Sequence, residues 1–564
     1  MLRYYQLCLL CLLPVCGLTQ DLQQSLKKIK DRWQDQPVNW HGHFSVQGIT
    51  NRIEGADRRV DPFSLRIQAG LVLDVLGIKA PFQFNYSDGN TLYRLPSFLI
   101  SGISPHYKNF TLHAGDRSMY FSDYSLAGHG FRGIGLEYNS QKSGWYSAAF
   151  YGRLRRAFAS DLESKQAIEP TQKRMGFGVK TGYRRRGDEI TVSIIKIWDS
   201  DQPLDMDQVP ELKPAENVVL SLQIKKQLGI KWNLEGELAQ SLLNQDKNAS
   251  PWSGSGWNQT YGLIQPTITY QKNLAYKGGF TYRITPRHDI RFFLEHIDPG
   301  YRSLGALFFQ NDFERIALQS HHQFLKNKLQ LQIDLGSERN NLKQFEGNQL
   351  RRLRGSMHIQ WLATPEWQWV GHFSNIRQTN KLYAFNNPAL PVDSLVLAIT
   401  NNQAQLQSLY NNKDRSRSFQ FLLQYQELQQ IRDEQITDQS SANWLSSFQY
   451  NWRLCNDRAW IAALFTLNTN ASENLQLHSW SPGMTWNHQV HPDWNYTLSV
   501  IPSLIIQNQQ HAAIWSARAQ LRHRISPAQQ LQLAFQYLNR SGSVASRFPD
   551  FVESNLRLQY QYHF

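Results

Sequence analysis

The chain ends with Ser554-Asn555-Leu556-Arg557-Leu558-Gln559-Tyr560-Gln561-Tyr562-His563-Phe564, and from Leu556 onward apolar and polar residues alternate without exception. Side chains of a β-strand point alternately to its two faces. One face therefore carries Leu556, Leu558, Tyr560, Tyr562 and Phe564. The other face carries Arg557, Gln559, Gln561 and His563. This pattern is typical of a transmembrane β-barrel, whose lipid face is apolar and banded by aromatic residues while its lumen is polar.

The same stretch resembles the C-terminal signal that bacterial outer-membrane proteins present to their barrel-assembly machinery. The five apolar residues from Leu556 to Phe564 would form that assembly signal. The resemblance implies a location in the outer membrane of a Gram-negative bacterium. It also implies outer-membrane lipid, lipopolysaccharide and, during insertion, the assembly machinery as partners.

The first twenty residues are typical of a secretory signal peptide. Arg3 precedes an apolar run at residues 7–13, and small or polar residues follow. Cys16 leaves open an alternative in which the processed chain is lipidated, although Val15 is larger than the residue that usually precedes a lipidated cysteine. Cys8, Cys11 and Cys16 all lie in this segment, so Cys455 alone clearly remains in the mature chain, which cannot rely on an internal disulfide.

Alternating segments recur far from the terminus. Apolar residues alternate with glutamine and other polar residues near residues 329–335, 418–426 and 530–537. A β-sandwich would need several domains to use so many strands, and no linker divides the chain. No later stretch approaches the roughly 20 apolar residues of a membrane helix. We therefore predict an all-β fold, a transmembrane antiparallel β-barrel of about 26 strands, over residues 38–564.

Residues 21–37 precede the predicted barrel. Leu22, Leu26, Ile29 and Trp33 recur at helical spacing among basic residues. We expect a short N-terminal amphipathic helix that lies in the periplasm or in the lumen.

The topology follows from the terminal strand. If Phe564 lies on the periplasmic side, the connections alternate, and the longer ones, such as residues 539–553 and 380–393, fall on the outer side. Residues 298–312 fit best as one long outer loop. The same alternation places the long segment at residues 243–258 on the periplasmic side, where short turns are expected. This indicates a miscount of strands between that segment and Arg287.

The net charge of +14 is compatible with nucleic-acid binding, but the cations do not cluster in a tail or on a helix. Many alternate with apolar residues on candidate strands, where they would line a lumen or meet anionic lipid head groups at the rims of a barrel. This arrangement predicts a net-basic lumen and no nucleic-acid partner. The predicted luminal basic residues are Arg174, Lys180, Arg184, Arg518, Arg522 and Arg524.

Motifs for other chemistry are weak. Residues 128–133 match G-x-G-x-x-G, but the alternation continues as a strand instead of opening the helix that a dinucleotide site needs. His41 and His43 share a strand face and favour a polar luminal pair over a metal site, whereas His321 and His322 point to opposite faces. Two further pairs contain residue types that are used in catalysis, His296 with Asp298 and Asp116 with His129. Such pairs can be found in any sequence of this length, so they do not indicate a catalytic site. We predict no catalytic, cofactor-binding or metal-binding residue.

Three segments, at residues 104–108, 120–129 and 297–313, resemble those of an uncharacterised group of large outer-membrane barrels from Bacteroidota. The similarity spans most of the chain. It implies location and fold, and it implies no functional residue.

The predicted fold indicates a class of function and does not identify a solute or a partner. A wide polar lumen predicts a channel or transport protein for polar or anionic solutes, or part of an export system. The alternative is a structural or assembly scaffold that binds a surface lipoprotein or a secreted partner. A third reading, an outer-membrane hydrolase, rests on the unspecific histidine pairs alone.

Overall fold

The computed structural model describes residues 38–56, 61–75, 78–87, 102–157, 171–200, 212–252, 260–306, 310–343, 348–383, 394–432, 435–436, 440–454, 458–472, 475–508, 510–542 and 550–564. The predicted signal peptide, the predicted amphipathic segment at residues 21–37 and Cys455 lie outside these residues. Among the described residues, we find no helix with the length and apolar character that a membrane crossing requires.

The described chain is built almost entirely of strands. The first half contains β1 (Val38–Glu54), β2 (Phe63–Val75), β3 (Ile78–Ser87), β4 (Gly102–Ile103), β5 (His106–Tyr107), β6 (Phe110–Ser118), β7 (Gly130–Asn139), β8 (Trp145–Arg155), β9 (Arg174–Arg185), β10 (Asp188–Asp199), β11 (Glu216–Leu228), β12 (Trp232–Asn244), β13 (Tyr270–Thr285) and β14 (His288–Ile297). The second half contains β15 (Phe313–Phe324), the 3-10 turn η2 (Leu325–Asn327), β16 (Leu329–Asn340), β17 (Asn348–Leu362), β18 (Trp367–Tyr383), β19 (Ser394–Asn411), β20 (Arg417–Arg432), β21 (Gln435–Ile436), β22 (Ser441–Leu454), β23 (Ala459–Ser472), β24 (Leu475–His491), β25 (Trp494–Gln507), β26 (Gln510–Ser526), β27 (Gln529–Gly542) and β28 (Phe551–His563).

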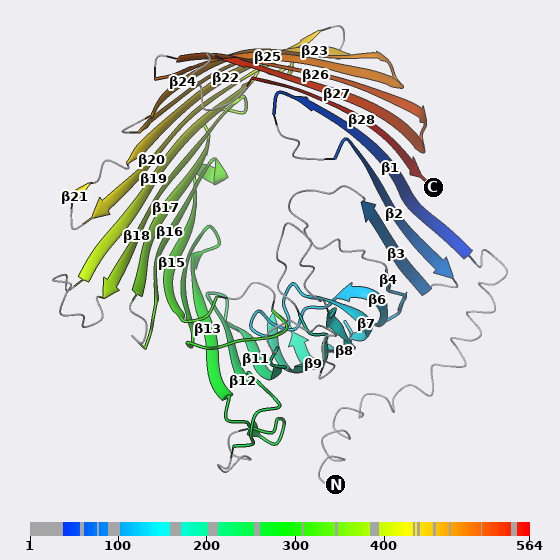
Figure 1. The fold of residues 1–564 in the computed structure, drawn as a ribbon, viewed down its shortest axis with the longest axis vertical. Coiled ribbons are helices and arrows are strands. Elements are labelled where there is room, and N and C mark those ends of the chain that lie inside the picture. The colour runs from blue at the N-terminus through cyan, green and yellow to red at the C-terminus, as the bar shows by residue number, and fades with distance from the viewer. Residues whose placement is uncertain are drawn as a thin grey trace.

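These strands form one closed antiparallel barrel (Figure 1). Each strand pairs with its neighbours in sequence, and β1 closes the ring by pairing with both β2 and β28. β4 and β5 are two halves of one interrupted strand between β3 and β6, and the short β21 only extends the edge of β20, so the ring has 26 strands. The predicted barrel and its strand number are confirmed. With strands about 4.8 Å apart and tilted by about 40°, such a ring is on the order of 50 Å across.

The outer surface of the barrel is apolar. Large apolar side chains remain exposed around the ring, among them Ile134, Val192, Leu318, Val500 and Leu558. We call the end of the barrel that holds Phe564 the near end, and the opposite end the far end. Aromatic rings that point outward encircle the near end: Trp40, Trp145, Tyr183, Trp232, Tyr282, Trp361, Trp369, Tyr410, Trp452, Trp486 and Trp494. An apolar band with an aromatic girdle is the exterior of a membrane-spanning barrel.

The terminal strand supplies the seam at which the ring closes. The residues of the predicted assembly signal all lie on the outward face of β28, where Leu556 and Leu558 are exposed. Phe564 continues the pairing: Gly42 N donates to Phe564 O at 2.7 Å, and Phe564 N donates to Gly42 O at 3.0 Å. The Phe564 ring lies over Gly42, whose missing Cβ would be only 3.0 Å from Phe564 Cζ, and its centroid is 5.2 Å from that of Trp40.

The connections alternate between the two ends as the sequence predicts. Short turns such as His491 to Trp494 and Ser526 to Gln529 lie at the near end, and the longer connections lie at the far end. The expected outer loop at residues 298–312 joins the far ends of β14 and β15. The placement of residues 243–258 on the wrong side of the membrane came from a miscount of strands. Because β13 is one uninterrupted strand of 16 residues, the described residues 245–252 and 260–269 also lie at the far end.

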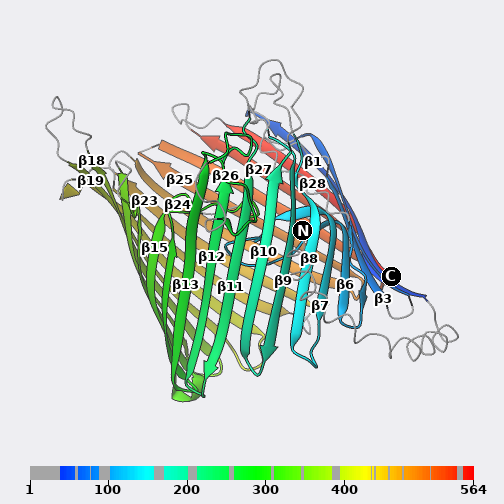
Figure 2. The same cartoon turned by 90° about the horizontal axis from the view of Figure 1, so that it is seen from below.

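Part of this last connection folds over the outside of the barrel (Figure 2). Ile264 is buried against the outward-facing Val218 and Leu242. Tyr261 Oη donates to Gln240 Oε1 at 2.9 Å, and Lys196 Nζ donates to Leu263 O at 3.2 Å. The far ends of β10 to β12 are therefore covered by protein on their outer face.

Candidate functional site

Two of the far-end connections fold inward and occupy one side of the lumen (Figure 1). The first inner segment comprises residues 119–129, between β6 and β7, and the second comprises residues 298–306, after β14. Their buried apolar side chains, Met119, Phe121, Tyr124, Leu126, Tyr301 and Leu304, share one core with inward-facing residues of the wall. The wall contributes Phe131, Ala148, Phe150, Leu154, Ile195, Ile197, Val219, Ala239, Ala275 and Ile297. The barrel thus has a packed apolar core on one luminal wall, where a water-filled barrel would present polar side chains.

The two inner segments are bound to each other. Tyr301 Oη donates to Tyr124 O at 2.9 Å, and Ser303 Oγ donates to Ser125 O. Ala127 and Ala306 form a parallel β-bridge. Since these contacts satisfy backbone groups that are removed from water, the two segments form one unit.

The second inner segment is also fixed to the wall. Leu304 N donates to Asn217 Oδ1 at 3.2 Å, and Ser241 Oγ donates to Arg302 O at 2.6 Å. Asn217 and Ser241 are fully buried on adjacent strands, β11 and β12, and they are joined by a hydrogen bond of 2.8 Å. This polar pair on an otherwise apolar wall is a specific attachment point for the segment.

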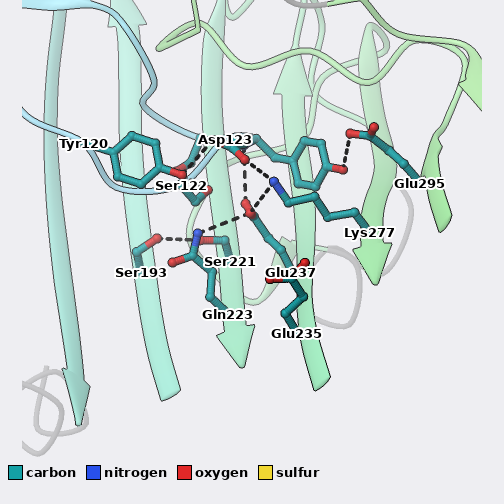
Figure 3. A network of polar contacts seen from close by, with 12 residues as sticks. Tyr120, Ser122, Asp123, Ser193, Ser221, Gln223, Glu235, Glu237, Lys277 and Glu295 are labelled. Atoms are coloured by element: carbon teal, nitrogen blue, oxygen red, sulfur yellow. Dashed lines mark hydrogen bonds and ion pairs between the residues drawn. The ribbon is translucent and has the colours of Figure 1, made fainter. Parts of the chain in front are cut away.

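Charged groups fix the first inner segment (Figure 3). Lys277 of β13 forms ion pairs with Asp123 of the segment and, at 3.4 Å, with Glu237 of β12. Glu237 also accepts a hydrogen bond of 3.2 Å from Gln223. On the other side, Tyr124 Oη donates to Glu295 Oε1 at 2.7 Å. Tyr124 N also donates to Glu237 Oε1 at 3.4 Å. Both wall carboxylates therefore contact the segment directly, and Lys277 joins Glu237 to Asp123.

The surroundings shift the acidity of the groups on the segment. Burial alone would raise the pKa of Asp123, but hydrogen bonds from Lys277 and Tyr120 outweigh it, so this pKa lies below its usual value. Burial and the neighbouring Glu295 carboxylate raise the pKa of Tyr124 far above its usual value. At neutral pH, Asp123 is thus a carboxylate that accepts hydrogen bonds, and Tyr124 is a neutral phenol that donates one.

A cavity of about 870 Å³ extends from the inner segments toward the near end of the barrel. Its charged lining is balanced, with the acids Asp123, Glu137, Glu189, Glu235, Glu237 and Glu295 and the bases Lys180, Arg184, Lys225, Lys277, Arg291 and Arg315. Many of these charges neutralise one another, because Arg184 pairs with Glu189 at 3.0 Å, Arg291 with Glu235, and Arg315 with Glu295. Such a lining offers hydrogen-bond donors and acceptors to a polar solute without a large net charge.

The predicted luminal basic residues fall into two groups. Lys180 and Arg184 line the cavity, where Lys180 Nζ donates to Tyr120 O at 2.6 Å. Arg174 lies on the same face of β9 nearer the far end and forms an ion pair of 2.8 Å with the buried Asp199. Arg518, Arg522 and Arg524 lie together on β26, on the opposite wall, because outward-facing Leu521 and Ile525 alternate with them. The structure therefore does not bring the six residues together.

The other sequence motifs have ordinary structural surroundings. The G-x-G-x-x-G stretch runs into β7, so its continuation as a strand is confirmed. His321 faces Asp289 in the lumen at 3.7 Å while His322 contacts the outward-facing His288, as their opposite orientation predicts. His296 contacts Asp298 at 3.2 Å.

The remaining two histidine motifs are separated from the partners that a site would need. Asp116 forms an ion pair with Arg132, and His129 Nδ1 lies 2.8 Å from Gly130 O. The His43 ring lies 6.2 Å from that of His563 on the luminal side of the seam. In the described parts of the chain, no group of three potential ligands is placed to hold a metal ion.

Sequence reasoning missed the residues that hold the inner segments, Asp123, Tyr124, Glu237, Lys277 and Glu295. Their partners are far apart in the sequence, with 171 positions between Tyr124 and Glu295. One signal was available. In β10, Ile194 lies on one face and Ile195 and Ile197 lie on the other, and a strand that is apolar on both faces is covered on both.

No protein-family model and no curated protein matches this sequence. Among solved structures, the chain is similar to the FrpB iron transporter from Neisseria meningitidis, with 8% identity and a TM-score of 0.38 over 93% of this chain and 81% of that chain. It is also similar to BauA, the ferric preacinetobactin receptor from Acinetobacter baumannii, with 8% identity and a TM-score of 0.39 over 93% and 80%. A third similar structure is OccAB2 from Acinetobacter baumannii, with 7% identity and a TM-score of 0.29 over 93% and 98%. Likeness at this level carries no statement about the solute, and the fold assignment rests on the strand order and exterior of this chain.

Proposed function

We propose that the protein is an outer-membrane transport barrel of a Gram-negative bacterium, and that it passes polar solutes through a lumen narrowed by the two inner segments. The observation that carries the proposal is the charge-balanced cavity of about 870 Å³ beside these segments. Among the described residues, the packed unit occupies one wall of a ring on the order of 50 Å across, which leaves width for solutes. The apolar exterior and its aromatic girdle support the membrane location.

Planar-bilayer recording tests this function. The purified barrel should carry ion current, and the Lys277→Met variant should carry more. Truncation of Lys277 leaves Glu237, whose side chain is 3% exposed, without its cation, and breaking a buried ion pair costs roughly 3–5 kcal/mol. The first inner segment should then leave the wall.

The control is Lys277→Arg, which keeps the charge and should keep the wild-type current. Heat-dependent mobility in SDS gels verifies that each variant is a folded barrel. A folded wild-type barrel without current would reject the transport function. An unchanged current in Lys277→Met would reject the role of the first inner segment.

A second candidate function, a scaffold for a surface lipoprotein or a secreted partner, is favoured by the length of β17 to β20. β18 and β19 have 17 and 18 residues, whereas about 9–11 suffice to span a membrane. Near the middle of β18 and β19 and toward the far end of β20, the outward-facing Asn375, Asn402 and Glu427 form a polar network with hydrogen bonds of 2.5 and 3.1 Å. Co-purification of one lipoprotein in stoichiometric amount after mild solubilisation would support this candidate over transport alone.

The membership in a group of large barrels from Bacteroidota also remains a proposal. Two of the three resembling segments, residues 120–129 and 297–313, overlap the inner segments at residues 119–129 and 298–306. Replacement of both segments by short turns tests whether they carry a shared activity, since the barrel wall should still fold without them. A variant that no longer forms a folded barrel would show that these segments are needed for folding of the wall.

A further inference from the structure

Three arginines lie close together on the luminal wall opposite the inner segments. Arg518 and Arg522 are on β26, on the face opposite the outward-pointing Leu521. Arg557 is on β28, between the outward-pointing Leu556 and Leu558. All three side chains are exposed within the lumen.

The strand register sets the distances between these arginines. Gln520, midway between Arg518 and Arg522, pairs with Ala534 of β27, and Ala534 pairs with Arg557. Arg557 is thus two strands, or about 10 Å, from the middle of β26, and the two arginines of β26 are about 13 Å apart along their strand. The small Ala534 side chain lies at the centre of this triangle, and a long arginine side chain can extend over it from each corner.

The charge of the triangle is not neutralised by its neighbours. Within the described residues, no carboxylate forms an ion pair with Arg518, Arg522 or Arg557, whereas the nearby Arg524 pairs with Asp493 at 3.0 Å. The cross-strand partners of the three arginines are uncharged. Ile49 and Ala534 pair with Arg557, and side chains that can hydrogen-bond lie around the triangle: Asn495, Thr497, Ser499, Gln532, Gln536, Asn555 and Gln559. This surface contrasts with the charge-balanced cavity on the opposite wall.

We propose that Arg518, Arg522 and Arg557 form a binding site for a multivalent oxyanion, such as a molecule with several phosphate or sulfate groups. A guanidinium donates two parallel hydrogen bonds to such groups, and three of them around a small residue match several oxyanions better than one small anion. The amide and hydroxyl neighbours supply further donors. The inference rests on the proposed transport function and deepens it, because it names a class of solute and the wall along which that solute moves. Lipid phosphates do not reach a luminal surface, so the ligand is a dissolved anion.

Block of the ion current by inorganic tripolyphosphate tests the site. Tripolyphosphate should block wild-type barrels, and the triple variant Arg518→Gln, Arg522→Gln, Arg557→Gln should need at least about tenfold more for the same block. Chloride at equal ionic strength should not block either protein. The affinity should fall when NaCl is raised from about 50 mM to about 500 mM.

The matched control removes three luminal cations that lie outside the cavity and away from the triangle, by Arg283→Gln, Arg432→Gln and Arg453→Gln. The net charge then falls by the same amount, and the block should stay at the wild-type concentration. Equal block of the triple arginine variant and the wild type would overturn the site, and so would an equal loss of block in the control.

Calorimetric titration of the detergent-solubilised barrel with tripolyphosphate separates the site from the transport function. Binding that is lost only in the triple arginine variant supports the site even if the barrel carries no current, in which case the transport function fails alone. Current without any binding of tripolyphosphate would overturn the site and leave the transport function standing.

Discussion

Lys277 joins the first inner segment to the barrel wall. Its ammonium group contacts Asp123 of the segment and Glu237 of β12, and it lies 5.2 Å from the centre of the Tyr124 ring. Glu237 is 3% exposed and Lys277 is 23% exposed, so each of these charges needs a partner, whereas Asp123 is half exposed and completes the contact from the segment. The position of the segment therefore depends on the charge of all three groups.

The pH dependence of the current tests this dependence at Asp123. Its pKa is lowered, so its contribution to anchoring is complete above the usual value of 3.8 and is lost as the pH falls through the lowered pKa. Current should stay level from about pH 8 to about pH 5 and rise only below about pH 4. The charged and titratable groups that face Asp123 are Lys277, Tyr120 and Glu237.

The Asp123→Asn variant is the control for this titration. It lacks the carboxylate at every pH, and its current should already be raised at about pH 7 and change little on acidification. A rise of the wild-type current between about pH 7 and pH 5 would contradict the assignment to Asp123, whose lowered pKa excludes titration in that range.

At the scale of elements, the second inner segment depends on close packing at Gly305. A Cβ there would lie 2.8 Å from Ser125 O and 2.9 Å from Ile197 Cδ1. Gly305→Val should force the two inner segments apart, at a cost of about 1–3 kcal/mol for overpacking. We expect a larger current and faster proteolysis within residues 119–129, both measured on the folded barrel.

Gly371→Val provides the comparison for this substitution. Gly371 lies in β18, where the nearest atom to an added Cβ is Ile359 Cβ at 3.9 Å. Proteolysis and current of this variant should match the wild type. Equal behaviour of Gly305→Val and Gly371→Val would show that the inner segments tolerate the added side chain and are not tightly packed.

The strands could be predicted from the sequence because a lipid face imposes an alternation that each strand carries by itself, as Leu556 to Phe564 do. The inner segments could not. Residues 298–312 were correctly expected to connect strands at the far end, but nothing local indicates that Leu304 joins the buried core of the luminal wall instead of facing water. Burial of such a residue is decided by contacts with distant strands, and pattern analysis of one segment does not contain them.

At the scale of the whole molecule, the net charge of +14 is not spread evenly over the lumen. On one wall, Lys180 and Arg184 belong to a charge-balanced cavity, and on the other, Arg518 and Arg522 have uncharged neighbours. Alternation along single strands predicts that all four face the lumen. Which of them keep an unpaired charge depends on side chains from neighbouring strands and inner segments, so a sum over the sequence overstates the basic character of the cavity wall.

Closure of the whole ring depends on the pairing of β28 with β1, and Phe564 lies at the near end of this seam. Phe564→Ala removes the ring that covers Gly42 and contacts Trp40, a contact worth about 0.5–1.5 kcal/mol beyond the burial of its area. We expect less folded barrel in the outer-membrane fraction, measured by heat-dependent mobility in SDS gels. Val552→Ala removes apolar surface from the outward face at the far end of the same strand and should leave assembly unchanged. If both variants assembled as the wild type does, the seam would close without help from its aromatic end, and the pairing of the strand backbones would suffice.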